Sequence, residues 1–569
     1  MTIGATVANA LWLASMRPAA RAFERALDQP GAAQWRWLAR QLQLHASSEF
    51  GQAREFGRID SPRTYARAVE LCTYDDLAPH IARIGAGVRD VLATGRVTHL
   101  APTSGSTGAR KLIPFNAELQ RGFSAAVGAW MHDLVRQRPA LVGGPAYWSI
   151  SPLVEEAAEE SNAARTARGA AQCVPPGADE CDVPHAAIPI GFADDADYLG
   201  AGAAWLVRQA MAAPSSLRHV RDMQAFWRLT ALALLRRRGL RLISAWHPSF
   251  VDILMDAASN AWEELLDAIA SGTCPWIAAL PPGARAGWTT SPDPHRADEL
   301  RRLGRDSWPS WWPQLQVISC WGEQGAEAGW RSIARHVSAH ASHVLVQPKG
   351  LLATEGVVTV PHGMTHVLAL NSHFFEFLDR DGNVRLAQEL NRGGEYEVVL
   401  SNGGGLWRYR LGDMVACTGH LKATPTLQFL GRAGQVSDLR GEKLSEPFVA
   451  RALRGAWEGG EMPAYVALRA WNDGAAAGYE LLVAEEARAD GANARDAAHE
   501  ARLRHLERAL CENPHYALAR RLGQLQPLRE RSVPRDAARD DLWSHPGRLG
   551  DAKPRLLLPA VERRIAPDG

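Results

Sequence analysis

Three features are scarce in this chain: lysine, blocks of like charge, and long apolar runs. The 569 residues carry 63 basic and 62 acidic side chains, a formal net charge of +1. Without a continuous basic stripe to meet a phosphate backbone, we expect no nucleic-acid partner. No stretch approaches the roughly 20 apolar residues that a membrane-spanning helix needs, so we expect no membrane span. The apolar stretch from Ala5 to Met16 is shorter and has no basic residue before it, which argues against a secretory signal.

Cysteine is also sparse, and the cysteines are scattered. They are seven in number and never spaced as a close ligand pair: Cys72, Cys173, Cys181, Cys274, Cys320, Cys417 and Cys511. This pattern argues against structural zinc and favours a reducing compartment. We therefore expect a cytoplasmic protein, and we expect it to be a monomer or a weak homo-oligomer.

Lysine is the scarcest charged residue. Only five of the 63 basic residues are lysines: Lys111, Lys349, Lys422, Lys443 and Lys553. Arginine is a broad planar fork and lysine a compact point charge, so the two differ most where one oxygen must be reached in a tight site. Chance retention explains any single lysine equally well. Chance explains less well why three of the five lysines lie in glycine-containing motifs.

The length and the residue pattern predict more than one domain. A chain of 569 residues exceeds what one hydrophobic core supports. Helical spacing occurs at residues 22–46, 73–87 and 217–240, and two segments, from His99 and at 241–255, are typical of α/β units. Strand-like runs then predominate between residues 309 and 400: 315–321, 343–347, 356–361, 365–371 and 396–402.

A polar, glycine-rich stretch after Phe429 precedes a smaller alternation of strands (465–471 and 479–486) and a helix (498–510). We place a domain boundary at Gly431. The predicted organisation is α/β: a large N-terminal domain, residues 1–430, with β-sheets flanked by helices, and a small mobile α+β C-terminal domain, residues 431–569.

The segment TSGSTGARK, residues 103–111, is predicted to bind phosphate. Gly105 and Gly108 permit backbone angles that let successive N–H groups converge on an anion, and Ser104, Ser106 and Thr107 add hydroxyl donors. The spacing is not that of a P-loop, which disfavours a kinase or GTPase. A polar hairpin turn remains the alternative, although it does not explain the unbroken run of small residues before Lys111. A helix is expected to start within PFNAELQRGF, residues 114–123.

Two acidic segments further along suit a nucleotide. Thr354 and Glu355 follow an apolar run in GLLATEG, and Asp413 follows the YRLG turn. A carboxylate at the end of a strand can accept the hydroxyl groups of a ribose, and another can hold magnesium between phosphates. Either acid alone is as readily a solvated surface residue.

Four stretches together resemble a known family: TSGSTGARKLIPF, GLLATEG, GEYEVVLSNGGGLWRYRLGDMV and FLGRAGQVSDLRGEKLSE. In that order they are similar to the signature stretches of the Gretchen Hagen (GH3-type, auxin-responsive) acyl-acid amidosynthetases, a branch of the firefly-luciferase-like adenylate-forming superfamily. Weaker similarities occur at residues 73–87, at SAWHPSFVDIL, at 374–378 and at GRLGDAKPR. The resemblance covers nearly the whole chain, and the order and spacing of the stretches make it specific.

The resemblance implies an ATP-dependent carbon–nitrogen ligase that forms AMP, with ATP and Mg²⁺ as cofactors. A carboxylic acid would be activated as an acyl-adenylate and then transferred to an amine such as an amino acid. The implied phosphate-binding residues are Thr103, Ser104, Gly105, Ser106, Thr107, Gly108 and Lys111.

Other roles carry over by the same resemblance. Thr354 would contact the α-phosphate or the carboxylate, and Glu355 would be catalytic and bind magnesium. Asp413 would bind the ribose, and Arg432 would lie at the interdomain hinge. Lys553 would be the catalytic lysine of the C-terminal domain, which moves in to neutralise the charge developing on the α-phosphate. A small domain that rotates about residues 431–438 would let one enzyme expose the acyl group to the amine afterwards.

Departures from the family pattern limit this transfer. Plant members carry Ser-Ser-Glu where this chain has Ala353, Thr354 and Glu355, and threonine keeps the hydroxyl group. The segment around Lys553 is short and lacks a glutamine expected before the lysine. The loop WGEQG, residues 321–325, is a weaker candidate to face the adenine.

Two other functions stay open. One is an acyl-adenylate-forming ligase with coenzyme A or a carrier thiol as acceptor, and the other is a non-catalytic nucleotide-binding protein. The many tryptophans between Trp308 and Trp330 suit core packing better than an acyl pocket. His247 and His373 are assigned no catalytic role, and Cys320 and Cys417 lack a visible basic partner for covalent chemistry.

Overall fold

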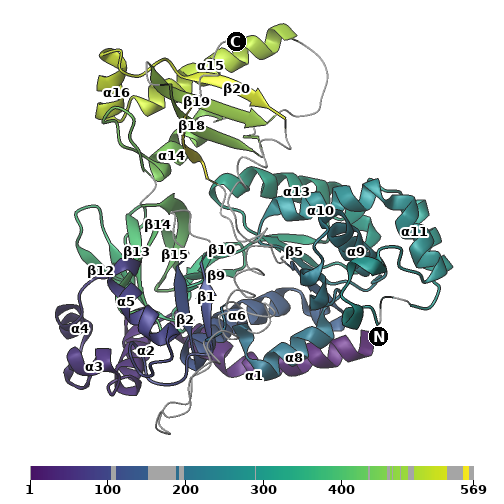
Figure 1. The fold of residues 1–569 in the computed structure, drawn as a ribbon, viewed down its shortest axis with the longest axis horizontal. Helices are drawn as coiled ribbons and strands as arrows, with labels where there is room; N and C mark the ends of the chain where they lie inside the picture. Colours follow the sequence, from purple (N-terminus) through teal and green to yellow (C-terminus); the bar gives the residue numbers. More distant parts are fainter. Residues whose placement is uncertain are drawn as a thin grey trace, which may run out of the picture.

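The structure is a computed structural model. It describes residues 2–103, 111–150, 188–190, 198–286, 288, 290–433, 436–457, 462–463, 465–473, 476–484, 492–534 and 555–562. These residues form a mixed α/β protein with a large N-terminal domain and a smaller C-terminal domain, as the sequence predicts (Figure 1).

Helices dominate the first hundred residues, as expected. They are α1 (Thr2–Ala26), α2 (Pro30–Leu44), α3 (Glu49–Ala53), α4 (Pro62–Ala68) and α5 (Tyr74–Gly85). The start of α5 is fixed by a reciprocal cap, because the main-chain N–H of Thr73 donates to the carboxylate of Asp76 at 2.8 Å. This cap sets the first turn of α5, where Tyr74 lies.

A four-stranded parallel sheet follows in the order β3 (Ala146–Trp148), β4 (Leu242–Ser244), β5 (Val317–Cys320), β6 (Leu345–Pro348). Parallel strands need crossover connections, and helices supply them on both faces. One face packs on α9 (Met223–Leu235), α10 (Pro248–Asn260), α11 (Trp262–Ser271), α12 (Pro294–Leu303) and α13 (Glu327–His340). The other face packs on α1, α6 (Ala117–Gln137) and α8 (Ala201–Ala210).

The second large sheet is antiparallel. Its order is β12 (Val384–Leu386), β11 (Phe374–Leu378), β13 (Glu395–Ser401), β14 (Tyr409–Leu421), β15 (Thr424–Arg432), β10 (Thr365–Leu368), β9 (Thr359–His362). Two small hairpins accompany it: β1 (His99–Pro102) with β2 (Leu112–Phe115), and β7 (Leu352–Ala353) with β8 (Gly356–Val357). Strands therefore occur where the strand-like runs of residues 309–400 predict them.

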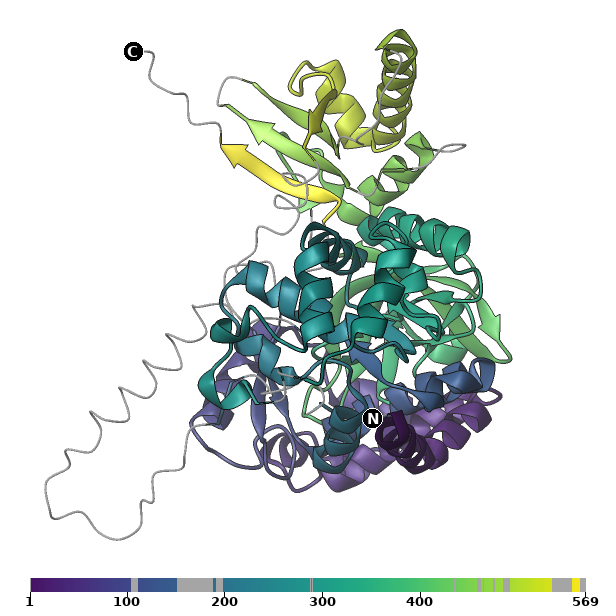
Figure 2. The ribbon, with the colours of Figure 1, turned by 90° about the vertical axis from the view of Figure 1, so that its right-hand side faces the viewer.

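The C-terminal elements stand apart from both large sheets in the two perpendicular views (Figures 1 and 2). They are β16 (Val436–Ser437), β17 (Leu444–Ser445), α14 (Glu446–Ala456), β18 (Val466–Asn472), β19 (Ala477–Ala484), α15 (Ala492–Leu510), α16 (Pro514–Arg521), β20 (Arg529–Val533) and β21 (Leu557–Glu562). Strands β20, β19, β18 and β21 form one sheet with its own apolar core. The boundary at residue 431 stays a prediction.

Candidate functional site: a charged cluster beside the antiparallel sheet

The predicted phosphate loop joins the two strands of the β1–β2 hairpin. The main-chain N–H of Thr103 donates to the carbonyl oxygen of Lys111 at 2.9 Å, so these two residues close the hairpin around the loop. Ser104, Gly105, Ser106, Thr107 and Gly108 lie outside the described residues. Helix α6 begins at Ala117, within the predicted stretch, although strand β2 before it was not predicted.

Both described ends of this loop carry groups that suit an anion. The hydroxyl oxygen of Thr103 is buried and has no hydrogen-bond partner among the described residues. The ammonium group of Lys111 lies 5.6 Å from the ring centroid of Tyr74, and the hydroxyl oxygen of Tyr74 accepts a hydrogen bond from the N–H of Leu112 at 2.9 Å. Tyr74 therefore holds the start of strand β2 and faces the ammonium group of Lys111, the residue before that strand.

Thr354 and Glu355 form the turn of the β7–β8 hairpin. Two contacts hold this hairpin. The side-chain amide of Asn402 donates to the carbonyl oxygen of Glu355 at 2.7 Å, and the N–H of Val357 donates to Nε2 of His373 at 3.1 Å. Glu355 is 5 % exposed, so its carboxylate faces the protein and not the solvent.

The surroundings of Glu355 bring the predicted residues together. Burial raises the pKa of its carboxyl group, the positive charges of Arg432 and Lys111 oppose that rise, and the negative charge of Asp413 adds to it. Lys111, Asp413 and Arg432 therefore all lie within electrostatic range of Glu355. A buried acid with two cations and a second acid beside it is typical of a site that binds a charged ligand.

Asp413 and Arg432 face each other across neighbouring strands. They are register partners on β14 and β15, and Nε of Arg432 lies 3.2 Å from Oδ1 of Asp413. Asp413 is fully buried, whereas the Arg432 side chain is 32 % exposed. The carboxylates of Asp413 and Glu355 raise the pKa of Arg432, so its guanidinium stays charged. Arg432 thus joins the buried carboxylate of Asp413 to the partly exposed edge of the cluster.

The C-terminal domain touches the same cluster. The main-chain N–H of Leu556, at the start of β21, donates to the carboxylate of Glu446 at 2.9 Å. Burial lowers the pKa of Arg555, the carboxylate of Glu446 raises it, and the charge of Arg432 lowers it. Arg555 is therefore within electrostatic range of Arg432. Lys553, two residues earlier, lies outside the described residues.

The loop WGEQG packs against β15 and α14. Oε1 of Glu323 lies 3.0 Å from Nδ1 of His366, and the side chain of Gln324 donates to the carbonyl oxygen of Phe429 at 2.7 Å. Arg454 of α14 donates to the side-chain oxygen of Gln324 at 3.2 Å. This loop therefore joins the two domains, and its role in facing the adenine stays a prediction.

The structure agrees with the expectation that these histidines and cysteines have no catalytic role. Burial lowers the pKa of His247 and of His373 to about 3, so both are neutral. Burial raises the pKa of Cys320 to about 12, with Lys349 opposing the rise, so this thiol is not a nucleophile. Trp311 and Trp312 are fully buried in the core.

Sequence reasoning missed the residues that support the cluster. Three residues hold it through hydrogen bonds to distant segments of the chain. Asn402 bonds Glu355, His373 bonds Val357 and Tyr74 bonds Leu112, over sequence separations of 47, 16 and 38 residues. Such separations leave no periodic signal in one sequence. Only the glycine-rich run after Asn402 hinted at a close approach of the main chain at this point.

Magnesium fits the site through few protein ligands. Among the described residues no group of three or more His, Cys, Asp or Glu side chains is arranged to hold a metal ion. Mg²⁺ commonly binds through one or two carboxylates together with substrate phosphates, and Glu355 would supply one carboxylate. The described residues also contain no helix with the length and hydropathy of a bilayer-spanning segment.

The fold is similar to those of two solved structures. A solved GH3.15 acyl acid amido synthetase in complex with 2,4-DB superposes with a TM-score of 0.78 at 17 % identity, covering 95 % of this chain and 94 % of that chain. A 2-hydroxyisobutyryl-CoA ligase in the postadenylation state superposes with a TM-score of 0.51 at 13 % identity, covering 94 % and 90 %. This chain therefore shares its fold with these two solved structures.

The family is shown by sequence. The model of the GH3 family N-terminal domain matches residues 19–166 and 180–339, and that of the GH3 family central domain matches residues 366–432. This chain belongs to the GH3 family.

Curated relatives include plant amido synthetases. Jasmonoyl–L-amino acid synthetase JAR6 of Nicotiana attenuata is 25 % identical over 476 residues, which is 76 % of this chain and 74 % of that protein. The probable indole-3-acetic acid-amido synthetase GH3.6 of Oryza sativa subsp. japonica is 30 % identical over 34 % of this chain and 44 % of that protein. A GH3 domain-containing protein of Homo sapiens is 29 % identical over 41 % and 44 %.

Proposed function

We propose that this chain is an amide-forming ligase that uses ATP, joins a carboxylic acid to an amine such as an amino acid, and releases AMP. The observation that supports this proposal best is the convergence of Lys111, Glu355, Asp413 and Arg432 on one buried cluster. Its curated relatives are named as jasmonoyl-amino acid and indole-3-acetic acid-amido synthetases. The resemblance of the sequence motifs points to the same reaction.

The proposed reaction has two steps, adenylation of the acid and transfer of the acyl group to the amine. In the first, a carboxylate oxygen of the acid attacks the α-phosphorus of ATP, and the bond to the bridging oxygen breaks as pyrophosphate leaves. In the second, the amine nitrogen attacks the acyl carbonyl, the bond to the phosphate oxygen breaks, and AMP and a proton leave. The protein's task is to place and neutralise the charges on the phosphates.

We assign the residues to these tasks as follows. Lys111 and the loop from Thr103 to Gly108 hold the outer phosphates, and Thr354 contacts the α-phosphate or the carboxylate. Glu355 holds Mg²⁺, Asp413 accepts the ribose hydroxyl groups, and Lys553 faces the α-phosphate during the first step. The orphaned hydroxyl group of Thr103 and the cations around Glu355 support this assignment.

The two steps need different surroundings, which gives the C-terminal domain its role. A cation over the α-phosphate favours the first step, yet it obstructs the approach of an amine in the second. We propose that the small domain moves about the segment after Arg432 between the steps. The contact of Arg454 with Gln324 joins the domains in the present arrangement.

The decisive experiment is a substrate panel. Purified protein, Mg·ATP and a set of aryl, indolyl and aliphatic acids are incubated with either a mixture of amino acids or coenzyme A, and the products are identified by mass spectrometry. We expect an amide and AMP with at least one acid. A thioester without an amide would favour the coenzyme A alternative, and no acid-dependent product would favour a nucleotide-binding protein without catalysis.

The assignment of Lys553 has a separate test. Lys553→Ala is expected to slow acid-dependent exchange of labelled pyrophosphate into ATP by about 100- to 1000-fold, because a preorganised charge on the transition state is lost. ATP binding, measured by calorimetry, should weaken much less. An equal loss of exchange and binding would show that the role is misassigned. The cytoplasmic location and the monomeric or weakly associated state stay predictions.

A further inference from the structure

Asn402 occupies a fully buried position at the end of β13, and each side-chain atom has a distinct task. Its Oδ1 accepts hydrogen bonds from the N–H of Gly404 at 2.9 Å and of Leu406 at 3.1 Å. Its Nδ2 donates to the carbonyl oxygen of Glu355 at 2.7 Å. The oxygen therefore shapes its own loop, while the nitrogen reaches a different segment of the chain.

We propose that Asn402 is a positioning residue for the adenylation step. Its side-chain amide fixes the turn of the β7–β8 hairpin, so that the Glu355 carboxylate faces Lys111 and Arg432. This inference rests on the proposed function and adds to it a residue outside the predicted site. The bond joins the glycine-rich loop to the main chain of Glu355, and so Asn402 acts through Glu355 and does not touch substrate.

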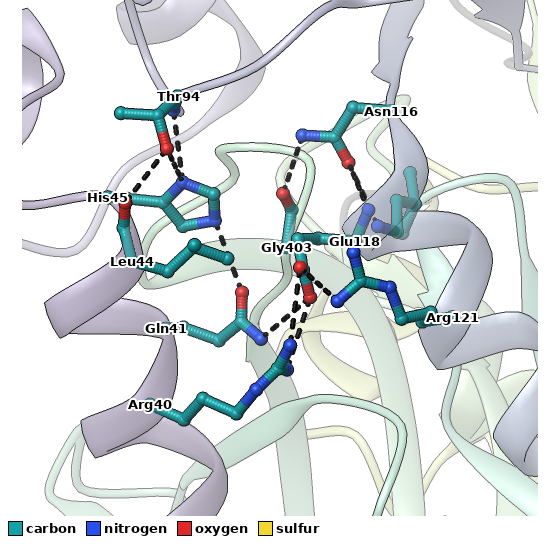
Figure 3. Close-up of polar contacts among 10 residues, drawn as sticks. Arg40, Gln41, Leu44, His45, Thr94, Asn116, Glu118, Arg121 and Gly403 are labelled. Atoms are coloured by element: carbon teal, nitrogen blue, oxygen red, sulfur yellow. Dashed lines mark hydrogen bonds and ion pairs between the residues drawn. The ribbon is translucent and has the colours of Figure 1, made fainter.

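The loop that carries Asn402 is itself rigidly held. Nδ2 of Asn116 donates to the carbonyl oxygen of Gly403 at 2.8 Å, while Oδ1 of Asn116 caps helix α6 (Figure 3). A Cβ atom added to Gly403 would lie 2.5 Å from Cβ of Glu118, so the loop packs directly on the helix. The loop that carries Asn402 is thus held against helix α6, which fixes the position of the side-chain amide.

Hydrogen bonds from helix α2 hold the side chain of Glu118. Its carboxylate accepts hydrogen bonds from Arg40 at 3.1 Å and from Gln41 at 3.3 Å, and Gln41 also contacts His45 (Figure 3). Burial lowers the pKa of His45 to about 4, so this imidazole is neutral near pH 7. A buried and satisfied polar network of this kind rigidifies the elements it joins.

The base of the hairpin has separate supports. Val357 donates to His373 at 3.1 Å, and the hydroxyl group of Ser372 donates to the carbonyl oxygen of Val357 at 3.1 Å. A Cβ atom on Gly356 would lie 2.5 Å from Nε2 of His373, so this side of the hairpin is closely packed. Loss of the Asn402 donor should therefore release the turn without unfolding the hairpin.

Asn402→Asp removes the donor and, when the new carboxyl group is ionised, adds a buried negative charge. The aspartate keeps an oxygen for the N–H groups of Gly404 and Leu406, but when ionised it presents a second oxygen to the carbonyl of Glu355. When protonated, the same carboxyl group donates an O–H to that carbonyl and restores the bond. Burial raises the pKa of a carboxyl group, so protonation can occur within an accessible pH range.

The expected result is a pH-dependent rescue. At pH 8, Asn402→Asp should exchange pyrophosphate into ATP at least about tenfold more slowly than wild type, since small displacements of catalytic groups are costly. The ratio of variant to wild type should rise as the pH falls to 6. Asn402→Ala, which loses the donor and the acceptor, should show no such recovery. The rate is measured with the acid that gives the fastest exchange in the panel.

Other titratable groups around the loop cancel in this ratio, because wild type carries them too. They come from every element packed against it: Glu355, Glu118, Arg40, Arg121, His45, Arg408 and Glu376. A ratio close to one at pH 8 would overturn the inference.

A matched control separates positioning from packing. Nδ2 of Asn9 donates to the carbonyl oxygens of Val142 and Gly144 at 3.2 and 2.9 Å, on helix α1. Asn9→Asp makes the same chemical change there. We expect this variant to show a ratio close to one at each pH. A pH-dependent ratio as large as that of Asn402→Asp would also overturn the inference.

A readout without catalysis keeps the inference independent of the reaction. Hydrogen exchange of a peptide covering residues 352–357, measured without nucleotide, should speed up in Asn402→Asp at pH 8 and not in Asn9→Asp. Unchanged exchange in Asn402→Asp would contradict the inference even if the enzyme were active. If wild type shows no acid-dependent activity, the proposed function fails, while the hydrogen-exchange result still tests the contact.

Discussion

The antiparallel sheet buries two arginine–carboxylate groups that differ in how fully the arginine is satisfied. Arg408 binds Glu376 through two hydrogen bonds of 2.8 and 3.0 Å, and donates to the carbonyl oxygens of Ala66 and Val69. Both charged side chains are almost fully buried, at 4 % and 2 % exposure. The pair joins the N-terminal helices to the sheet, so its role is structural.

Arg432 is held in a different way. It contacts Asp413 at 3.2 Å, remains one-third exposed, and has a second acid, Glu355, within electrostatic range. The contrast teaches that loss of one partner from a closed pair destabilises the fold, whereas an open group, with a partly exposed cation beside two buried acids, is arranged for a ligand.

The closed pair should give the largest effect on stability. Glu376→Gln leaves the buried charge of Arg408 uncompensated, so the free energy of unfolding should fall by about 3–5 kcal/mol. Chemical denaturation measures this change. Glu397→Gln is the matched control, because its partner Arg410 is 44 % exposed, and exposed pairs contribute up to about 1 kcal/mol. Equal losses in the two variants would remove the distinction between closed and exposed pairs.

The open group should show the reverse behaviour. Glu355→Gln is expected to slow acid-dependent pyrophosphate exchange by about 100- to 1000-fold, because a group that holds the metal and phosphates is lost. Burial raises the pKa of Glu355, so this carboxyl group favours folding when protonated and costs stability above its folded pKa. At neutral pH the variant should therefore unfold no more easily than wild type, by thermal denaturation. A large loss of stability with normal exchange would make Glu355 a structural acid.

A smaller effect is expected at the edge of the open group. Tyr74→Leu removes the ring beneath the Lys111 ammonium group, and such a contact contributes about 0.5–1 kcal/mol at a partly exposed site. The KM for ATP should rise roughly two- to fivefold beyond the change in Tyr74→Phe, which keeps the ring and loses only the hydroxyl group. Steady-state kinetics with varied ATP decide this. An identical KM in the two variants would show that the ring does not act on the lysine.

The contact of His366 with Glu323 of the interdomain loop should give an effect that depends on pH. Burial lowers the pKa of His366, but Glu323 and the carbonyl of Pro348 together raise it above its ordinary value. The stability from this pair is fully present below about pH 6.5, the ordinary pKa of histidine, and is lost as the pH rises through the folded pKa.

His366→Gln should abolish this dependence, with a change of about 1.4 kcal/mol for each unit of pKa shift. Denaturant unfolding of wild type and variant at pH 6 and pH 9 measures it. A stability difference that is larger at pH 9 than at pH 6 would contradict the assigned direction.

The sequence identified the charged residues of the cluster better than the residues that support them. Lys111, Glu355 and Asp413 lie in motifs whose residue types suit phosphates, a metal and a ribose. The pairing of Asp413 with Arg432 was not predictable, since β14 and β15 contain two register shifts along their length. Only the folded sheet determines which side chains oppose each other after such shifts.

The residues that support the cluster could not be predicted, for a related reason. Asn402 and Tyr74 act through single hydrogen bonds to main-chain atoms of distant segments, and main-chain atoms are the same for every residue type. Strand β2 was missed because four apolar residues before a helix carry no strand-specific period. Strands β13, β18 and β19 and the helices α2 and α5 were predicted because their apolar positions repeat over several turns or alternations. The two long strands β14 and β15 were not predicted, and the expected turn at residues 409–412 lies within β14.

The most direct test of the central claim compares two lysines. Calorimetry should measure the affinity of Mg²⁺ and α,β-methylene-ATP, which is not cleaved, for wild type, Lys111→Ala and Lys422→Ala. Lys422 pairs with Asp28 at 2.9 Å on the exposed surface. We expect Lys111→Ala to weaken binding by roughly 10- to 100-fold, the size of a lost charge-assisted hydrogen bond, and Lys422→Ala to leave it unchanged. Equal affinities for all three proteins would contradict the claim that the open charged group binds ATP.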